Sequence, residues 1–457
     1  LEDLEYHEVL SQVAVFAITE LGAQACLATQ PLPDSPELHQ QLQAVFEFHA
    51  SFENDNRIPN HGFEDLSTSI KMLQIENSVL EIQAFRAIGA SSETVNTLLN
   101  FFKKFKAYYP TLFDWGKEMA VNKEIKKEVD HVIDRFGEVR NNASEDLSRI
   151  RKQIHQLKGR IGQSFNKALS HYTQQDYLDD IRESVLDNKR VLAVKAMYRR
   201  KVKGTIMGSS KTGSIVFMEP ETTAQLTREL QNLLYEETEE IKKILSQLTN
   251  YLRPHTDLIR QYQNYLLQLD VVYAKACYAQ DINGILPKIT DTQEIEYGQA
   301  YHPLLWKTHQ TEKKKTYPQD IQLHPGKRIV VISGPNAGGK SITLKTVGLL
   351  QLMLQSGLLI PVHERSRATL FNTILTDIGD NQSIENHLST YSYRLKNMKV
   401  FLKKCNNKTL FLIDEFGTGS DPELGGALAE VILEDFYERH ALGLITTHYS
   451  NLKLLAN

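Results

Sequence analysis

The 457-residue sequence has little cysteine, no apolar run long enough to cross a bilayer, and almost no excess charge of either sign. Its cysteines, Cys26, Cys277 and Cys405, lie far apart without a Cys-x-x-Cys pair, which argues against zinc or a disulfide framework and indicates a reducing compartment. A reducing compartment predicts a cytoplasmic protein, and the lack of a membrane-length segment predicts no membrane partner. The formal net charge of −4 excludes a uniformly basic nucleic-acid coat but leaves room for a local basic patch.

The length and the order of patterns predict a multi-domain chain, because 457 residues exceed the size of one hydrophobic core. We expect an all-α core with long antiparallel helical arms and a small β-rich tip, followed by an α/β domain. The predicted segments are a helical core (1–135), an ascending arm (136–185), a basic β tip (186–220), a descending arm and core (221–286) and the α/β domain (287–457). Since the sequence lacks a starting methionine and stops soon after its last motif, we expect it to be part of a longer chain.

Two segments carry apolar residues at the alternating three-and-four spacing of a narrow helical seam. The first follows a predicted cap at Ser144, and the second follows Pro220, with Glu237 interrupting its rhythm. The seam residues are Leu147, Ile150, Ile154, Leu157, Ile161, Phe165 and Ala168 in the first segment, and Leu226, Leu230, Leu233, Ile241, Ile244, Leu248 and Leu252 in the second. We expect the two helices to pack as antiparallel arms.

The segment between the predicted arms is basic and rich in β-forming residues. It has no acidic residue between Asp187 and Glu219. Clustered Lys and Arg attract phosphate by charge and counterion release without reading bases, so the segment predicts a tip that grips a nucleic-acid backbone. The alternative is a solvated basic hairpin. The candidate clamp residues are Lys195, Arg199, Arg200, Lys201, Lys203 and Lys211.

A phosphate-binding loop is predicted between an apolar strand at 328–333 and a following helix. Its residues are Gly334, Pro335, Asn336, Ala337, Gly338, Gly339, Lys340 and Ser341. The glycines let backbone N–H groups and the helix N-terminus face the phosphates. Lys340 is expected to contact the β- and γ-phosphates of ATP, and the Ser341 hydroxyl to bind Mg2+.

Two further strand ends carry candidate catalytic groups. The strand 409–414 ends in Asp414, expected to support the magnesium ion, and Glu415 follows it as the base that activates water. His448 follows the strand 442–447, which we expect beside the phosphate-loop strand, so its imidazole is placed to sense the γ-phosphate. The alternatives are a capping or surface pair for the two carboxylates and a structural role for the histidine. Asp421 lies in the segment 417–422, whose small residues suit close approach by a second subunit.

These motifs together resemble the MutS family. Residues 380–391 are similar to the family's signature segment, which implies that Ser389 and Thr390 reach the partner subunit's nucleotide and that Asp421 lies in the dimer loop. The run Tyr301-His302-Pro303 resembles the start of the family's ATPase domain, and Tyr317 is a candidate for stacking on adenine. The resemblance implies an ABC-type P-loop ATPase that uses ATP and Mg2+ and forms a homodimer through that domain.

Two segments, 212–220 and 418–423, resemble the second bacterial branch of the family, which lacks the mismatch-reading and connector domains. The branch implies binding of branched DNA or of stalled ribosomes, and a C-terminal Smr nuclease domain that these residues do not include. The tripeptides at 136–138 and 217–219 match the family's Phe-x-Glu wedge outside any such domain, so mismatch reading is not expected.

Other classes of protein fit the motif order less well. In arm-bearing ATPases of the chromosome-structure or break-repair class, the coiled coil separates the phosphate loop from the Asp-Glu strand, whereas here Lys340 and Asp414 both follow the arms. A transporter subunit is disfavoured because no LSGGQ-type signature is present. A ribosome-splitting or rescue factor stays open, since ribosomal RNA and DNA present the same phosphate backbone to a basic tip.

Overall fold

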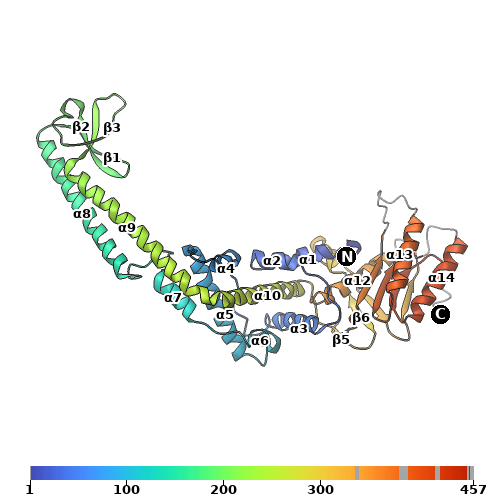
Figure 1. Cartoon of the computed structure of the whole chain (residues 1–457). Coiled ribbons are helices and arrows are strands. Elements are labelled where there is room, and N and C mark those ends of the chain that lie inside the picture. The colour runs from blue at the N-terminus through green and yellow to red at the C-terminus, as the bar shows by residue number, and fades with distance from the viewer. Residues whose placement is uncertain (1, 335–338, 380–389, 417–421, 450–451, 453–457) are drawn as a thin grey trace. The chain divides into compact units, whose positions relative to one another are not determined.

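The computed structural model describes residues 2–334, 339–379, 390–416, 422–449 and 452 (Figure 1). They form two compact units, one of Leu1–Glu64, Thr94–Val121 and Gln261–Asn457, the other of Asp65–Glu93 and Asn122–Arg260. These units cut across the predicted segments, because the first helices of the chain belong with the α/β part. Among the described residues no helix is long and apolar enough to cross a membrane.

The first unit combines short helices with two sheets. Its helices are α1 (Tyr6–Ala14), α2 (Glu20–Leu27), α3 (Pro36–Ala50), α6 (Pro110–Gly116), α11 (Pro303–Glu312), α12 (Lys340–Gln355), α13 (Thr390–Lys404) and α14 (Pro422–Glu438). Two longer helices have residues in both units, α5 (Ile82–Lys104) and α10 (Thr256–Asp281). A short 3-10 helix lies at Glu2–Leu4 in the first unit, and two more lie at Ala196–Tyr198 and Arg253–His255 in the second unit.

A parallel sheet of four strands forms the centre of the α/β part. Its order is β10 (Thr373–Asp377), β11 (Thr409–Ile413), β12 (Leu442–Thr446) and β8 (Ile329–Ile332). The predicted phosphate loop follows β8, the Asp414–Glu415 pair follows β11, and His448 follows β12. Asp377 is the last residue of β10. Because parallel strands end at the same edge, the sheet gathers these residues on one side.

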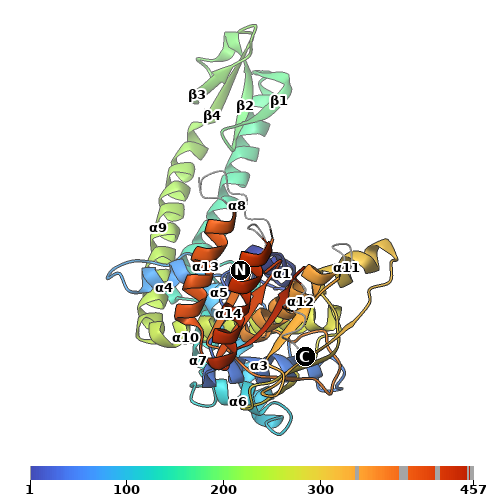
Figure 2. The same cartoon turned by 90° about the vertical axis from the view of Figure 1, so that its right-hand side faces the viewer.

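The two faces of this sheet are covered by different helices because successive side chains point to opposite faces. Leu410, Leu412 and Leu444 pack in the core cluster that contains α12, whereas Phe411 and Ile445 pack with α13 and α14. The Phe411 and Phe436 ring centroids are 4.5 Å apart. Figure 2 shows α13 and α14 together on their side of the sheet. This three-layer arrangement holds the strand ends rigidly.

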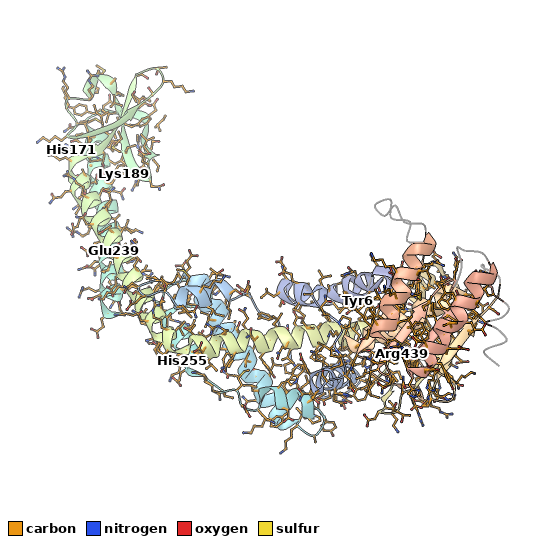
Figure 3. All side chains as sticks on the ribbon, turned by 45° about the vertical axis from the view of Figure 1, so that its right-hand side comes forward. Tyr6, His171, Lys189, Glu239, His255 and Arg439 are labelled. Carbon is orange, nitrogen blue, oxygen red and sulfur yellow. The ribbon has the colours of Figure 1, made fainter. Side chains whose placement is uncertain are left out.

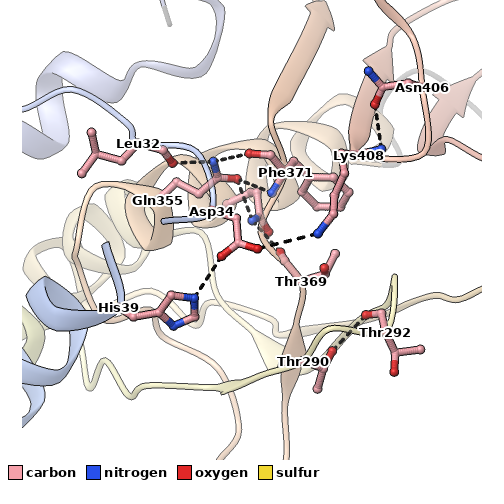
Figure 4. A network of polar contacts seen from close by, with 11 residues as sticks. Leu32, Asp34, His39, Thr290, Thr292, Gln355, Thr369, Phe371, Asn406 and Lys408 are labelled. Atoms are coloured by element: carbon pink, nitrogen blue, oxygen red, sulfur yellow. Dashed lines mark hydrogen bonds and ion pairs between the residues drawn. The ribbon is translucent and has the colours of Figure 1, made fainter. Parts of the chain in front are cut away.

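The C-terminal end of α12 is fixed by a buried amide network (Figure 4). Gln355 Nε2 donates to the carbonyl oxygens of Leu32 at 2.9 Å and Phe371 at 2.8 Å. Gln355 Oε1 accepts from the Phe371 N–H at 3.1 Å and from Gln351 Nε2 at 3.0 Å. All hydrogen-bonding capacity of the Gln355 amide is therefore used, which is the condition for burying it without a penalty.

A buried lysine also contacts the end of this helix. Lys275 of α10 donates at 2.6 Å to the carbonyl oxygen of Ser356, the residue after α12. Burial lowers the pKa of Lys275 to about 8. A cation at a helix C-terminus is favoured by the helix dipole. The helical and α/β parts of the first unit are thus joined at the far end of the helix that follows the phosphate loop.

A second sheet in the first unit was not predicted. It has the order β5 (Lys288–Ile289), β9 (Arg367–Ala368), β6 (Ile295–Ala300) and β7 (Gln319–Leu323). Two of its strands have only two residues, too short for a period-two pattern to show in the sequence. Three of its strands, β5, β6 and β7, precede β8 along the chain, and β9 follows α12.

The second unit is built on two long helices that lie side by side in Figures 1 and 2, α8 (Glu145–Gln174) and α9 (Glu221–Leu252). Ser144 caps α8, its hydroxyl accepting from the Leu147 N–H at 3.0 Å. Glu237, which interrupts the seam of α9, forms an ion pair with Arg151 of α8 at 2.7 Å. The unit also contains α4 (Ser67–Leu73) and α7 (Glu124–Val132).

A four-stranded antiparallel sheet, with the order β1-β2-β4-β3, joins α8 to α9. Its strands are β1 (Leu178–Leu186), β2 (Lys189–Lys195), β3 (Gly204–Ser209) and β4 (Ile215–Pro220). The predicted boundary at residue 186 is therefore wrong, because β1 was placed in the helical arm. β1 is an edge strand with an irregular register and only Leu178 buried, so it shows no apolar alternation.

Candidate functional site

The predicted nucleotide residues meet at the carboxyl edge of the parallel sheet. Lys340 follows β8, Asp414 and Glu415 follow β11, and His448 follows β12. β12 lies between the other two strands. The predicted position of the His448 strand beside the phosphate-loop strand is thus confirmed.

The described ends of the phosphate loop have the backbone that the motif requires. Gly339 has a φ of 79°, a left-handed conformation that glycine adopts without strain, and it precedes the first turn of α12. Lys340 is only 6% exposed, and its ammonium group donates to the carbonyl oxygen of Gly334. Pro335, Asn336, Ala337 and Gly338 lie outside the described residues. The N-terminus of α12 and the Lys340 charge together give an electropositive end to the loop.

Asp414 is held rigidly at the end of β11. Its Oδ1 accepts from the Thr446 hydroxyl and, at 3.2 Å, from the Glu415 N–H. Both bonds fall on one oxygen, so Oδ2 has no hydrogen bond to any residue that the structure describes. Asp414 is 7% exposed. A buried carboxylate with one oxygen fixed and the other available is a suitable ligand for a hard cation.

Glu415 has an unusual backbone for a residue other than glycine, with a φ of 49°. Its N–H donates to Thr446 Oγ1 at 2.7 Å, and the next N–H, of Phe416, donates to the Thr446 carbonyl at 2.8 Å. A left-handed conformation costs about 1–3 kcal/mol and persists where the surroundings determine it, commonly at functional sites. The Glu415 side chain is 39% exposed.

The residues present fit a magnesium ion bound together with a nucleotide. Among the described residues no group of three or more His, Cys, Asp or Glu could hold a metal by itself. Mg2+ at nucleotide sites needs no such cage, because one or two protein oxygens, water and the phosphates complete its shell. The Ser341 hydroxyl on α12 and Asp414 Oδ2 are the matching donors from this chain. The ion would neutralise charge on the phosphates.

The structure places the other predicted site residues as follows. His448 and Tyr317 are exposed, and Lys315 Nζ lies 5.0 Å from the Tyr317 ring centroid. Thr390 begins α13, while Ser389 and Asp421 lie outside the described residues. The roles of all five in sensing, stacking or contact with a partner stay predictions.

Three residues near the acidic pair were not predicted to contribute. Thr446 bonds both members of the pair, Arg394 contacts Glu415, and the carbonyl oxygen of Asp377 accepts from the Asp414 N–H at 2.9 Å. Burial raises the pKa of Asp377, against the Asn397 hydrogen bond and the Arg394 charge, which lower it. Only the fold brings these residues together, so no local motif in the sequence indicates them.

His302, in the run that resembles the start of the ATPase domain, is a buried histidine with a depressed pKa. It is 5% exposed, and its Nε2 has no hydrogen-bond partner among the described residues. Burial lowers its pKa to about 4, with Glu5 opposing and Lys345 adding to the shift. His302 Nδ1 lies 3.5 Å from the Leu305 N–H, a weak cap of α11.

We therefore expect His302 to make the protein sensitive to acid. An unfolded histidine binds a proton near pH 6.5 and the folded one only near 4, so the unfolded state binds more protons between these values and stability falls as the pH drops. The loss should approach about 3 kcal/mol near pH 4. Urea unfolding of the wild type and of His302→Asn at pH 7 and 4.5 measures it. Between pH 7 and 4.5 the free energy of unfolding should fall more in the wild type than in His302→Asn. An equal fall in the two proteins would contradict the prediction.

The basic residues between Asp187 and Glu219 fall into two groups. Lys189 pairs with Glu219 at 3.1 Å, Arg190 with Glu183 at 2.5 Å, and Lys195 with Asp176 at 2.8 Å (Lys189 is labelled in Figure 3). The Asp176 hydrogen bond raises the pKa of Lys195. Lys195 is therefore charge-compensated, and its role as a clamp residue stays a prediction. In this segment the exposed basic residues without an ion pair to any described residue are Arg199, Arg200, Lys201, Lys203 and Lys211.

A tyrosine pair supports the turn that carries Arg199, Arg200 and Lys201. The Tyr177 and Tyr198 ring centroids are 4.7 Å apart and the rings are inclined by 27°. Lys201 Nζ lies 5.6 Å from each ring centroid. The turn is thus anchored by stacked rings while its Arg and Lys side chains face solvent.

A glycine turn leading into a helix at one end of a parallel strand, with an Asp-Glu pair two strands away, defines a P-loop nucleotide-binding domain. Residues 330–457 match the family model described as MutS domain V. The chain is 33% identical over 99% of its length to the protein named "Endonuclease MutS2" from Bacillus velezensis, of which it covers 57%. It is also 34% identical over 99% of its length to "Endonuclease MutS2" from Leuconostoc mesenteroides, of which it covers 56%.

Another relative is the "Putative endonuclease MutS2" of Bacillus subtilis, 33% identical over 99% of this chain and 57% of that protein. The chain belongs to the MutS family, and it is a MutS2-like member. The resemblance inferred from the motifs is confirmed. The chain spans a little over half the length of these curated relatives.

Proposed function

We propose that this chain hydrolyses ATP at the carboxyl edge of the parallel sheet. The observation that supports this most is the placement of Lys340 and the Asp414–Glu415 pair at the ends of β8 and β11, separated by one strand. Lys340 and the α12 N-terminus bind the phosphates, Ser341 and Asp414 supply oxygens for Mg2+, and Glu415 accepts a proton from the attacking water. Hydrolysis of ATP by the purified chain in the presence of Mg2+ is the test, and its absence would reject the proposal.

We further propose that the active form is a homodimer through the ATPase domain. Residues 380–391 resemble the family segment that reaches the partner's nucleotide, so each site is completed by the other subunit. The ATPase rate per subunit should then rise steeply with protein concentration until the dimer is saturated. A rate per subunit that is constant from nanomolar to micromolar protein, with sedimentation showing only monomers, would contradict this.

We propose that the antiparallel sheet of the second unit grips a nucleic-acid backbone. The exposed Arg199, Arg200 and Lys201 on one turn support this, since they have no compensating carboxylate among the described residues. Phosphate contacts of this kind give affinity without base specificity. ATP binding and hydrolysis then control how the two subunits hold the nucleic acid.

Replacing Arg199, Arg200 and Lys201 together by Ala should weaken binding to any phosphate polymer. Each lost phosphate contact removes about 0.9 from the slope of log affinity against log salt, so the slope should flatten by roughly 2–3. The matched control is the triple replacement of the exposed Lys103, Lys104 and Lys106 by Ala, which removes the same charge elsewhere. If both triple variants have the wild-type slope, the binding surface lies elsewhere.

The preferred target is branched DNA, as in the resembling branch, and stalled or collided ribosomes are the second candidate. The exposed basic residues fit either target because both present phosphate. Binding to a four-way DNA junction, a linear duplex and ribosomes at one fixed salt concentration separates them. Preference for the junction supports the first target, and preference for ribosomes supports the second.

A further inference from the structure

Arg394 of α13 contacts Glu415 at two points. Its Nη1 donates at 2.9 Å to the Glu415 carbonyl oxygen, and its Nη2 lies 3.9 Å from Glu415 Oε2. The Arg394 side chain is only 14% exposed, so solvent and salt screen these contacts weakly. A guanidinium group has several donors in a fixed plane, which lets one side chain hold a carbonyl and a carboxylate of the same residue.

The same helix also holds the neighbouring strand end. Asn397, three residues after Arg394, donates to Asp377 Oδ1 at 3.2 Å, and Asp377 in turn accepts the Asp414 N–H through its carbonyl oxygen. Asp377, Arg394 and Asp414 line one small cavity of about 30 Å³. Thus α13 holds the acidic pair from the β10 side, while Thr446 holds it from the β12 side.

We propose that Arg394 is a positioning residue for hydrolysis, which fixes the left-handed backbone of Glu415 and directs its carboxylate toward the attacking water. The inference rests on the proposed ATPase function. The Glu415 N–H is held by Thr446 and its carbonyl oxygen by Arg394, so both sides of this strained residue are fixed. Without Arg394 the carbonyl loses its donor, and the carboxylate loses its orienting cation. The phosphate loop on β8 does not depend on these contacts, so nucleotide binding should be retained.

The test compares Arg394→Ala and Arg394→Lys with a control, Arg439→Ala. Arg439 follows α14, pairs with Asp435 at 3.1 Å and is 40% exposed, and Figure 3 labels it. For each protein, turnover at saturating ATP, affinity for a non-hydrolysable ATP analogue and melting temperature are measured. We expect Arg394→Ala to lower turnover roughly 10- to 100-fold, as a displaced catalytic group does, with affinity within about twofold of wild type. Arg394→Lys, which keeps the charge, should lose less, and Arg439→Ala should match wild type.

Two further measurements separate positioning from a purely structural role. Guanidinium ion added at millimolar concentration should restore part of the turnover of Arg394→Ala, because it supplies the missing donor. In the Glu415→Gln background, Arg394→Ala should have no further effect, since residues that act as a unit are not additive. An equal loss in both backgrounds, or unchanged turnover in Arg394→Ala, would overturn the inference. Failure of the proposed function is distinct, because the wild type would then not hydrolyse ATP, or Glu415→Gln would hydrolyse it normally.

Discussion

Glu415→Gln should leave ATP bound but lower the rate of hydrolysis by roughly 10²- to 10⁴-fold, the usual contribution of a positioned base. The substitution keeps the size of the side chain, replaces one acceptor oxygen by an amide donor and removes the ability to accept a proton. The backbone contacts of this residue, its N–H to Thr446 and its carbonyl oxygen to Arg394, do not involve the carboxylate. The site should therefore keep its geometry, and turnover is the quantity that changes.

Single-turnover hydrolysis and equilibrium ATP binding measure the two halves of this prediction. The control is Glu434→Gln, on an exposed carboxylate of α14 in the same domain. It should match the wild type in both assays. Turnover at the wild-type rate by Glu415→Gln would show that Glu415 is not the base that activates the attacking water.

Lys340→Ala should fail one step earlier, at nucleotide binding. Lys340 is buried at the start of α12, and its ammonium already bonds to the loop carbonyl of Gly334. A hydrogen bond between this ammonium group and a phosphate contributes about 1.5–3 kcal/mol. Losing that bond should weaken ATP affinity roughly 10- to 100-fold. Hydrolysis should fall with it, because the same charge stabilises the transferred phosphate.

Titration with a fluorescent ATP analogue measures this loss, and Lys327→Ala is the matched control. Lys327 is an exposed lysine in the connection between β7 and β8, outside the loop. It should bind ATP like the wild type. The melting temperature without nucleotide should be close to wild type in both variants. Unaltered ATP affinity in Lys340→Ala would place the nucleotide away from this loop.

The parts of the site that lie within continuous motifs could be predicted from the sequence. The phosphate loop needs glycines and a lysine at fixed spacing between a strand and a helix, and the acidic pair ends a fully apolar strand. The structure places β8 and β11 as these patterns predict, and it places β12 beside β8. The long helices α8 and α9 could likewise be predicted, because apolar residues repeat along both at alternating three-and-four spacing.

What could not be predicted depends on contacts between distant residues. Arg394 meets Glu415 only because α13 packs beside β10, the neighbour of β11, and Glu237 meets Arg151 only because α9 packs on α8. β1 was missed since an edge strand with a single buried residue has no apolar period to reveal it. Lys195 was predicted only as a clamp residue, and its ion pair with Asp176 depends on the fold, which brings the two residues together.

The most direct test of the central claim is an experimental structure of the Glu415→Gln chain with ATP and Mg2+. The γ-phosphate should lie within hydrogen-bonding distance of Lys340 Nζ at the start of α12, with Ser341 and Asp414 on the magnesium side. One water molecule should lie between the side chain at position 415 and the γ-phosphorus. A triphosphate bound at any other surface, or separated from position 415 by protein atoms, would contradict the account.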